Sequence, residues 1–132
     1  MFRTKATAYA IIGAVEVARQ HGEGSSSPVL VAEIASEYDL PVAYFSKVMS
    51  QLAKARILQS DRGPKGGFRL SRPPNKITLF EIYEAVEGTL DPGEAYEVSA
   101  SMRKGINDAI ARATSAIAKR LSMTTLTDLM GK

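Results

Sequence analysis

The 132-residue sequence contains no cysteine. Without thiols the chain can form no disulfide, no thiolate metal site and no cysteine nucleophile, and its redox compartment stays undetermined, with the cytoplasm as the default. Histidine is almost as scarce, since His21 is the only one. One imidazole makes neither a metal site nor a catalytic triad, so we expect His21 to help end the first helix as a polar C-terminal residue.

Long hydrophobic runs are also missing, because no apolar stretch approaches the roughly 18 to 20 residues of a membrane-spanning helix. The chain begins with a basic flank followed by an apolar stretch, a pattern that a signal peptide also shows. Glu16 and Arg19 interrupt that stretch while the helical period continues. The pattern therefore favours an amphipathic helix of the mature protein.

Charge is present in an uneven distribution. The composition, 45% hydrophobic and 23% charged, is typical of a soluble globular chain of one domain with one core. The net charge is +3, but residues 41–76 alone carry eight basic side chains and one acidic one, or +7, which leaves −4 for the rest. The basic residues are Lys47, Lys54, Arg56, Arg62, Lys65, Arg69, Arg72 and Lys76, and the acid is Asp61. Such a segment indicates a polyanion partner; the alternative is a solvated basic face.

The first half of the chain predicts three helices. Residues 6–21 carry an apolar stripe, and a glycine-rich loop follows at 22–28. A second helix is expected from about 28 or 29 to 38, and a third over 41–54, with Pro41 at its start. In the third helix Phe45, Val48, Met49 and Leu52 share one face, and Tyr44, Lys47, Gln51 and Lys54 share the opposite one. The short connection between the last two helices predicts a helix-turn-helix.

The next segment predicts a β-hairpin. Residues 57–62 and 68–72 are compatible with strands around the turn G-P-K-G-G, and Pro73-Pro74 ends the second strand. Thr78 and Glu81 then form a capping box for a fourth helix that ends at Gly88. After a loop at 89–97, a long amphipathic helix is expected over 99–121, and residues 124–130 form a last short helical turn.

Three helices, a hairpin and a helix follow the order of a winged helix-turn-helix protein. In that fold the N-terminal residues of the third helix read base edges in the major groove, here Val42, Ala43, Tyr44, Ser46 and Lys47. The hairpin is the wing, which places Arg62 and Lys65 against the minor groove or backbone. An ordinary surface hairpin with solvated charges is the alternative. The turn lacks the G-x-x-x-x-G-K-[ST] pattern of a phosphate-binding loop.

Residues 40–73 resemble the Rrf-two family of winged-helix bacterial transcription regulators, which includes iron–sulfur, nitric oxide and cysteine-metabolism regulators. The likeness rests on the pair Tyr44-Phe45, the turn Ile57-Leu58 and the wing Arg62-Gly63-Pro64-Lys65-Gly66-Gly67-Phe68-Arg69-Leu70. Residues 77–88 and 125–129 are also similar. The resemblance implies a cytoplasmic, nucleoid-associated repressor that binds double-stranded DNA as a homodimer and reads a pseudo-palindromic operator.

The fold class expected is mainly α with a small β-hairpin. Residues 1–88 would form the DNA-binding domain, 89–98 a linker or sensor loop, and 99–132 the dimerisation helix and tail. A long helix with an apolar stripe after a complete small domain needs a partner surface, and this argument does not depend on the resemblance. The alternative is that the helix folds back on the core of its own chain. The predicted DNA-binding residues are Val42, Ala43, Tyr44, Ser46, Lys47, Arg62, Gly63, Pro64, Lys65, Gly66, Gly67 and Arg69.

The chain departs from the family at the sensor. Cluster-binding members supply three cysteines between the fourth and fifth helices, whereas this chain has none, so we predict no iron–sulfur cluster and no other cofactor or metal. Some members also place a carboxylate where Ala8 stands. A small-molecule or protein effector would enter near the 89–98 loop. Cluster-binding relatives often carry glutamate in place of Ser46 and a hydrogen-bonding residue in place of Ala43, so the operator cannot be carried over.

Two alternatives stay open. An enzyme is disfavoured, because no Ser/His/Asp set, phosphate loop or metal-ligand spacing is visible, and we predict none. The other is a winged-helix protein-interaction module, or a regulator controlled by a partner protein with no direct ligand. Steeply salt-dependent binding to duplex DNA distinguishes the regulator from the interaction module.

Overall fold

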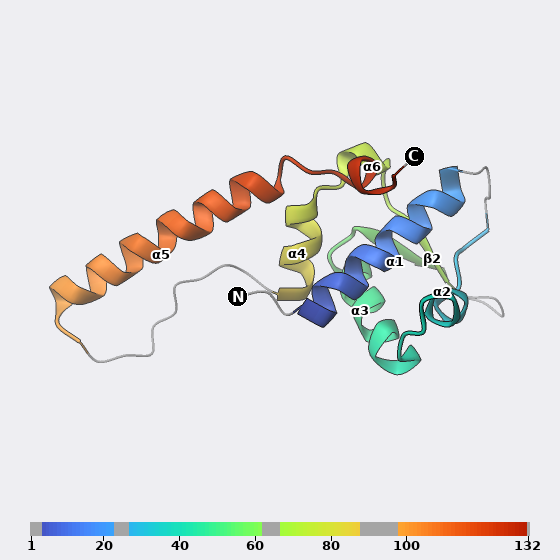
Figure 1. Ribbon diagram of the computed structural model, residues 1–132, viewed down its shortest axis with the longest axis horizontal. Helices are drawn as coiled ribbons and strands as arrows, with labels where there is room; N and C mark the ends of the chain where they lie inside the picture. Colours follow the sequence, from blue (N-terminus) through green and yellow to red (C-terminus); the bar gives the residue numbers. More distant parts are fainter. Residues whose placement is uncertain (1–3, 23–26, 62–66, 88–97, 132) are drawn as a thin grey trace.

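The computed structural model describes residues 4–22, 27–61, 67–87 and 98–131. Its elements confirm the expected winged-helix order (Figure 1). They are α1 (Thr4–Gly22), α2 (Val31–Tyr38), α3 (Val42–Lys54), β1 (Leu58–Asp61), β2 (Gly67–Leu70), the 3-10 turn η1 (Pro74–Lys76), α4 (Leu79–Glu87), α5 (Ala100–Leu121) and α6 (Leu126–Leu129). None of the helices in these ranges has the length and hydropathy of a membrane span.

The core forms where α1 crosses α3 and α4. Ala10, Ala14 and Val17 on α1 are fully buried, as the apolar stripe predicts. Small residues on α1 let α3 approach it closely, and the approach is closest at Gly13. A Cβ atom added there would lie 2.3 Å from Met49 Sδ, closer than any real contact. Gly13 therefore leaves the space that the Met49 side chain of α3 occupies against α1.

The antiparallel hairpin pairs Leu58 with Leu70 and Asp61 with Gly67. Its second strand also pairs with the segment before α2, because Val29 and Phe68 exchange two backbone hydrogen bonds of 2.9 Å. This bridge explains why α2 begins at Val31, later than the expected 28 or 29. It also constrains Gly67, which has a φ of 146° and lies where an added Cβ would be 2.7 Å from the Val29 carbonyl oxygen.

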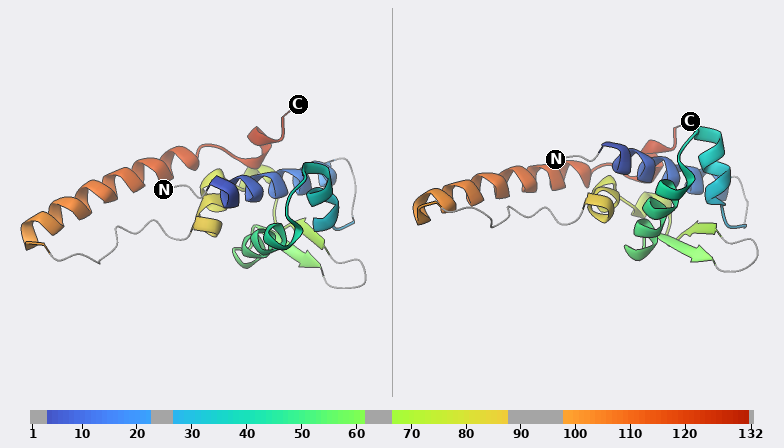
Figure 2. Two further views of the ribbon diagram at one scale, coloured as in Figure 1. Left: turned by 60° about the horizontal axis from the view of Figure 1, so that its bottom comes forward. Right: turned by 90° about the horizontal axis from the view of Figure 1, so that it is seen from below.

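Helix α5 projects from the rest of the molecule as an arm, in every view (Figures 1 and 2). None of its 22 residues is buried, so it does not fold back on its own core. The chain then returns to the domain. Leu126 is fully buried, its N–H donates to the Ile77 carbonyl at 2.9 Å, and the Leu79 N–H donates to the Thr124 carbonyl at 2.7 Å. The C-terminal turn is thus part of the domain, on the side away from α3 (Figure 1).

Candidate nucleic-acid interface

Helices α2 and α3 form the helix-turn-helix. The turn between them is built on Asp39, which has a φ of 55° and so reverses the chain in the left-handed region. The Leu40 N–H closes the turn on the Ala35 carbonyl at 2.8 Å. Pro41 is the N-cap of α3, and the helix begins one residue later than expected. Its carbonyl accepts from the Phe45 N–H at 2.9 Å.

Helix α3 presents two different faces. Phe45, Val48, Met49 and Leu52 are 0–1% exposed and anchor the helix to the core, as predicted. The N-terminal residues Val42, Ala43, Tyr44 and Lys47 are exposed, and Ser46 is half-buried. Val42 is 52% exposed, which leaves its side chain available for contact. Five of the twelve predicted DNA-binding residues therefore lie together on one accessible surface.

Tyr44 is held in place by aromatic packing. Its ring meets that of Tyr9 on α1 edge to face, with centroids 5.7 Å apart and an angle of 71°. Tyr9 makes a second edge-to-face contact, to buried Phe45, at 6.4 Å. Such contacts prefer this geometry. Tyr44 stays 40% exposed, so the α1 aromatic orients a side chain that still faces solvent.

The wing strands β1 and β2 lie on the same side of the domain as α3 (Figure 2). Arg69 on β2 pairs with Asp61 on β1, with its Nε 2.6 Å from the Asp61 carboxylate. This predicted DNA-binding cation is thus engaged within the hairpin, and Gly67 has the structural role given above. The other predicted wing residues, Arg62, Gly63, Pro64, Lys65 and Gly66, lie outside the described residues, and their role stays a prediction.

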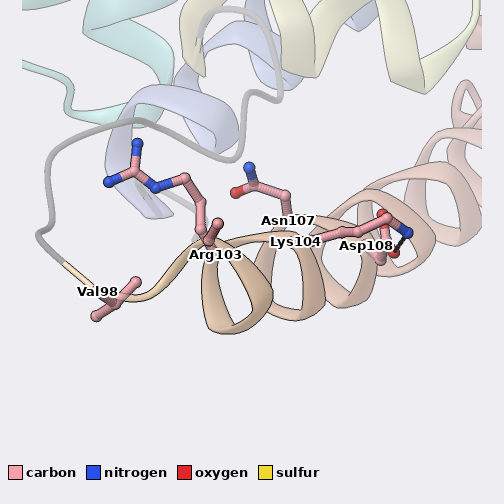
Figure 3. Close-up of a pocket in the computed structure, with 6 residues that line it drawn as sticks. Val98, Arg103, Lys104, Asn107 and Asp108 are labelled. Carbon is pink, nitrogen blue, oxygen red and sulfur yellow. Dashed lines mark hydrogen bonds and ion pairs between the residues drawn. The ribbon is translucent and has the colours of Figure 1, made fainter.

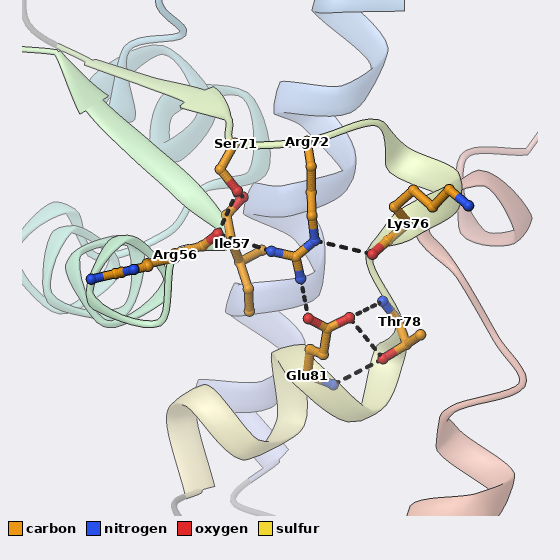
Figure 4. Close-up of polar contacts among 7 residues, drawn as sticks. All are labelled: Arg56, Ile57, Ser71, Arg72, Lys76, Thr78 and Glu81. Atoms are coloured by element: carbon orange, nitrogen blue, oxygen red, sulfur yellow. Dashed lines mark hydrogen bonds and ion pairs between the residues drawn. The ribbon is translucent and has the colours of Figure 1, made fainter.

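A polar network supports the turn from α3 into β1 (Figure 4). The Arg72 guanidinium donates to the Arg56 carbonyl and, through Nε, to the Lys76 carbonyl, both at 3.0 Å, and also pairs with Glu81. Glu81 accepts from the Thr78 N–H at 3.0 Å and Thr78 Oγ1 accepts from the Glu81 N–H at 3.2 Å, which confirms the capping box. The charge of Arg72, counted in the basic segment, is therefore used inside the domain.

The end of α3 is a complete Schellman turn. The Arg56 N–H donates to the Ala53 carbonyl and the Ile57 N–H to the Leu52 carbonyl, both at 3.0 Å. This turn requires a left-handed residue, and Arg56 has a φ of 62°. That conformation costs a residue with a Cβ atom about 1–2 kcal/mol, so glycine is the usual choice. The turn directs Ile57 and Leu58 into the core, where they are 1% and 2% exposed.

A buried acid links α1, α2 and the C-terminus. Glu16 is 7% exposed; its carboxylate accepts from the Tyr38 hydroxyl and pairs with Arg19 at 2.9 Å. Arg19 also donates to the Met130 carbonyl, with Nη2 at 3.0 Å. The hydrogen bond to Glu16, followed by burial, raises the pKa of Tyr38. The sequence signalled only that Glu16 and Arg19 interrupt an apolar stripe; their partners were not predicted.

His21 lies in the last turn of α1, as expected. Its Nε2 is buried without a hydrogen-bond partner among the described residues. Burial, followed by the positive charge of Arg69, lowers the pKa of His21, and Asp61 opposes them. The Arg69–Asp61 ion pair of the wing thus influences the pKa of a side chain at the end of α1.

The donor set does not suit an iron–sulfur cluster. The sequence offers no thiolate, and no three His, Asp or Glu side chains gather into a metal-binding group within the described ranges. An open pocket of about 500 Å³ does occur at the N-terminal end of α5, lined by Val98, Ala100, Arg103, Lys104, Asn107 and Asp108 (Figure 3). Arg103 and Asn107 point to the same side, and Lys104 pairs with Asp108 at 3.3 Å.

An exposed α3 face beside a two-stranded hairpin defines a winged helix-turn-helix protein, the architecture of many DNA-binding regulators. The chain belongs to the Rrf2 (Rrf-two) family: residues 3–132 match the family model, which is described as an iron-dependent transcriptional regulator. Proteins of this kind are generally not enzymes.

The relatives are transcriptional regulators. CymR of Bacillus subtilis is 31% identical over 121 residues, which are 92% of this chain and 83% of CymR. The solved structure of CymR, the global cysteine regulator of that organism, has a TM-score of 0.72 at 30% identity and covers 95% of this chain and 92% of that one. IscR of Cereibacter sphaeroides is 34% identical over 83 residues, or 63% of this chain. That match spans about half of IscR, 53% of its length.

Proposed function

We propose that the protein is a homodimeric, sequence-specific DNA-binding repressor that acts at the nucleoid in the bacterial cytoplasm. The exposed N-terminal surface of α3 carries this proposal. Val42, Tyr44 and Lys47 face solvent on a helix whose opposite face is fixed in the core. A helix presented in this way enters the major groove with its first residues at base edges.

Binding to labelled duplexes from the protein's own promoter region, at several salt concentrations, tests this function. A regulator binds one fragment far more tightly than random duplex and loses affinity steeply as salt rises. Lys47→Ala weakens binding, whereas the matched control Lys76→Ala leaves it unchanged, because Lys76 lies beside α6 and away from α3 (Figure 4). Absence of binding to every fragment at low salt contradicts the proposal.

The arm supports a homodimer. Helix α5 carries an apolar stripe that includes Met102, Ile106, Ala109, Ala113 and Ile117, yet the domain buries none of it. A second copy of the helix would cover that stripe and place two α3 helices side by side for a pseudo-palindromic operator. Sedimentation of the purified protein tests the dimer.

We also propose that this member of an iron-dependent family works without an iron–sulfur cluster. The proposal rests on the absence of cysteine, since such clusters are held by thiolates. Protein purified without oxygen from iron-supplemented cells is expected to be colourless and to contain no stoichiometric iron. A brown preparation with iron and acid-labile sulfide would contradict this.

An effector, in this proposal, occupies the pocket at the N-terminal end of α5. The pocket volume of about 500 Å³ is within the range of small-molecule sites, and the sequence points to the same end of the helix. Candidate ligands are screened by thermal shift, since a ligand that binds the folded state raises Tm. A hit whose shift survives Asn107→Ala and Lys104→Ala binds elsewhere and contradicts this location.

A further inference from the structure

The turn at the end of α3 holds a residue that its backbone geometry disfavours. Arg56 and Asp39 are the two non-glycine residues with positive φ within the described ranges. Aspartate is among the residues that tolerate the left-handed region, because its short side chain bonds locally. Arginine has no such compensation. An unfavourable backbone conformation retained at an exposed site points to a function of the side chain.

The fold uses the backbone of Arg56 but not its guanidinium. The Arg56 carbonyl accepts from Ser71 Oγ and from Arg72 Nη1. The Arg56 N–H donates to the Ala53 carbonyl, so both polar groups of its backbone are used at the turn. The side chain is exposed and makes no hydrogen bond or ion pair with a described residue. Figure 4 shows it extending away from Arg72 and Glu81, the charged pair behind the turn. Glycine would satisfy every described contact of this position.

The position of the turn suits a phosphate. Helix α3 has 13 residues, which corresponds to a length of about 20 Å at 1.5 Å per residue. The major groove is only about 12 Å wide. A helix whose first turn contacts bases therefore carries its last turn to the phosphates at the groove edge. Lys54 in that last turn adds a second exposed cation beside Arg56.

We propose that Arg56 is a DNA phosphate contact, kept in a strained left-handed position because its charge is needed where the recognition helix leaves the groove. The inference rests on the proposed DNA-binding function and adds to it a residue outside the N-terminal surface of α3. It assigns to the turn a contact that is independent of base sequence. Arg56 is therefore a binding residue for DNA of any sequence.

The test uses a fluorescein-labelled random-sequence duplex, fluorescence anisotropy over a range of NaCl concentrations, and urea unfolding of the same proteins. Each lost phosphate contact reduces the slope of log K against log salt by about 0.9. Arg56→Gly is expected to reduce the slope by about 1.8 per dimer, because a dimer loses two contacts. Its urea midpoint is expected to be equal to or higher than that of the wild type, since glycine relieves the left-handed strain.

Two further variants separate charge from backbone. Arg56→Asn tolerates the turn without charge and should reproduce the reduced slope. Arg56→Lys keeps both charge and strain and should retain a slope near that of the wild type. An unchanged slope in both neutral variants overturns the inference. So does a lower urea midpoint in both, which would mean that the arginine stabilises the C-terminal end of α3 through its charge.

The wild-type protein separates this inference from the proposed function. If wild-type protein fails to bind any duplex at low salt, the DNA-binding function itself is wrong and the inference falls with it. If wild type binds with a steep slope and Lys47→Ala weakens it while Arg56→Gly does not, the function stands and the role of Arg56 alone is wrong.

Discussion

The winged domain and the α5 arm are built on opposite principles. In the domain, α3 buries four of its 13 residues, and polar groups such as Glu16 and Glu81 have partners on other elements. In the arm, 22 consecutive helical residues bury none. An isolated amphipathic helix gains little stability from propensity alone. The domain therefore has a core of its own, whereas the apolar stripe of the arm is left uncovered, and in our proposal a second copy covers it.

Because of this difference, similar substitutions should have different effects in the two regions. Alterations of the domain core should act on folding, and alterations of the arm should act on assembly and, through it, on DNA binding. The two regions are joined where the chain returns from α5, at the bridge between Thr78 and Thr125. That bridge fixes the C-terminal end of the arm to the start of α4.

The largest effect is expected from a charge in the arm's apolar stripe. Ala113→Glu would place two carboxylates in the dimer interface, where burying each unpaired ion costs several kcal/mol. We expect a folded monomer by sedimentation and circular dichroism. The control Ser115→Glu lies about 200° away around the helix, at about 100° per residue, and should remain dimeric. A dimeric Ala113→Glu protein would show that another surface mediates assembly.

The next largest effect is a difference in stability between isoleucine-to-alanine substitutions in the domain and in the arm. Ile82→Ala removes a fully buried α4 side chain and should lower the free energy of unfolding by about 2–5 kcal/mol. Ile117→Ala, on half-buried α5 surface, should cost much less. Both are made in the Ala113→Glu background, so that no partner covers the arm, and are measured by urea unfolding. Equal costs would contradict the division into a packed domain and an uncovered arm.

Local and periodic signals predicted most of the fold. The two faces of α3 follow from a repeat of three and four residues, and the capping box of Thr78 and Glu81 follows from a spacing of three. Both were confirmed, because each depends on the spacing of residues along a single helix, which the sequence gives directly. The long helix and the final short turn were also confirmed.

Contacts between distant segments were not predicted. The residues around Glu16 do not predict its hydrogen bond with Tyr38, and those around Val29 do not predict its bridge to Phe68. Such pairs form only when the whole chain is folded. The basic segment shows the same limit. Its count of charges does not distinguish Arg69 and Arg72, which pair inside the domain, from Lys47 and Arg56, which face solvent.

A smaller effect compares the two N-caps. Thr78 Oγ1 caps α4 in the domain, and Ser99 Oγ caps α5 by accepting from the Met102 N–H at 3.2 Å. Thr78→Ala should lower the free energy of unfolding of the domain by about 0.5–2 kcal/mol. Ser99→Ala should leave it unchanged and instead speed hydrogen exchange of the first turn of α5. A global loss of stability in Ser99→Ala would mean that the arm and the domain unfold as one unit.

The smallest effect is a pH dependence confined to the domain, since α5 contains no histidine. Burial and the Arg69 charge lower the pKa of His21 in the folded protein, so the unfolded chain binds its proton more readily. The free energy of unfolding is therefore undiminished above the unfolded-state pKa of about 6.5 and falls as pH drops from there through the lower folded-state pKa.

Thermal midpoints of wild type and His21→Gln, measured at intervals between pH 8 and pH 5, test this pH dependence. The wild type should lose more stability than the variant over the acidic half of the range, because glutamine binds no proton. Parallel curves would assign the acid sensitivity to groups other than His21, and would contradict the effect that burial and the Arg69 charge have on its pKa.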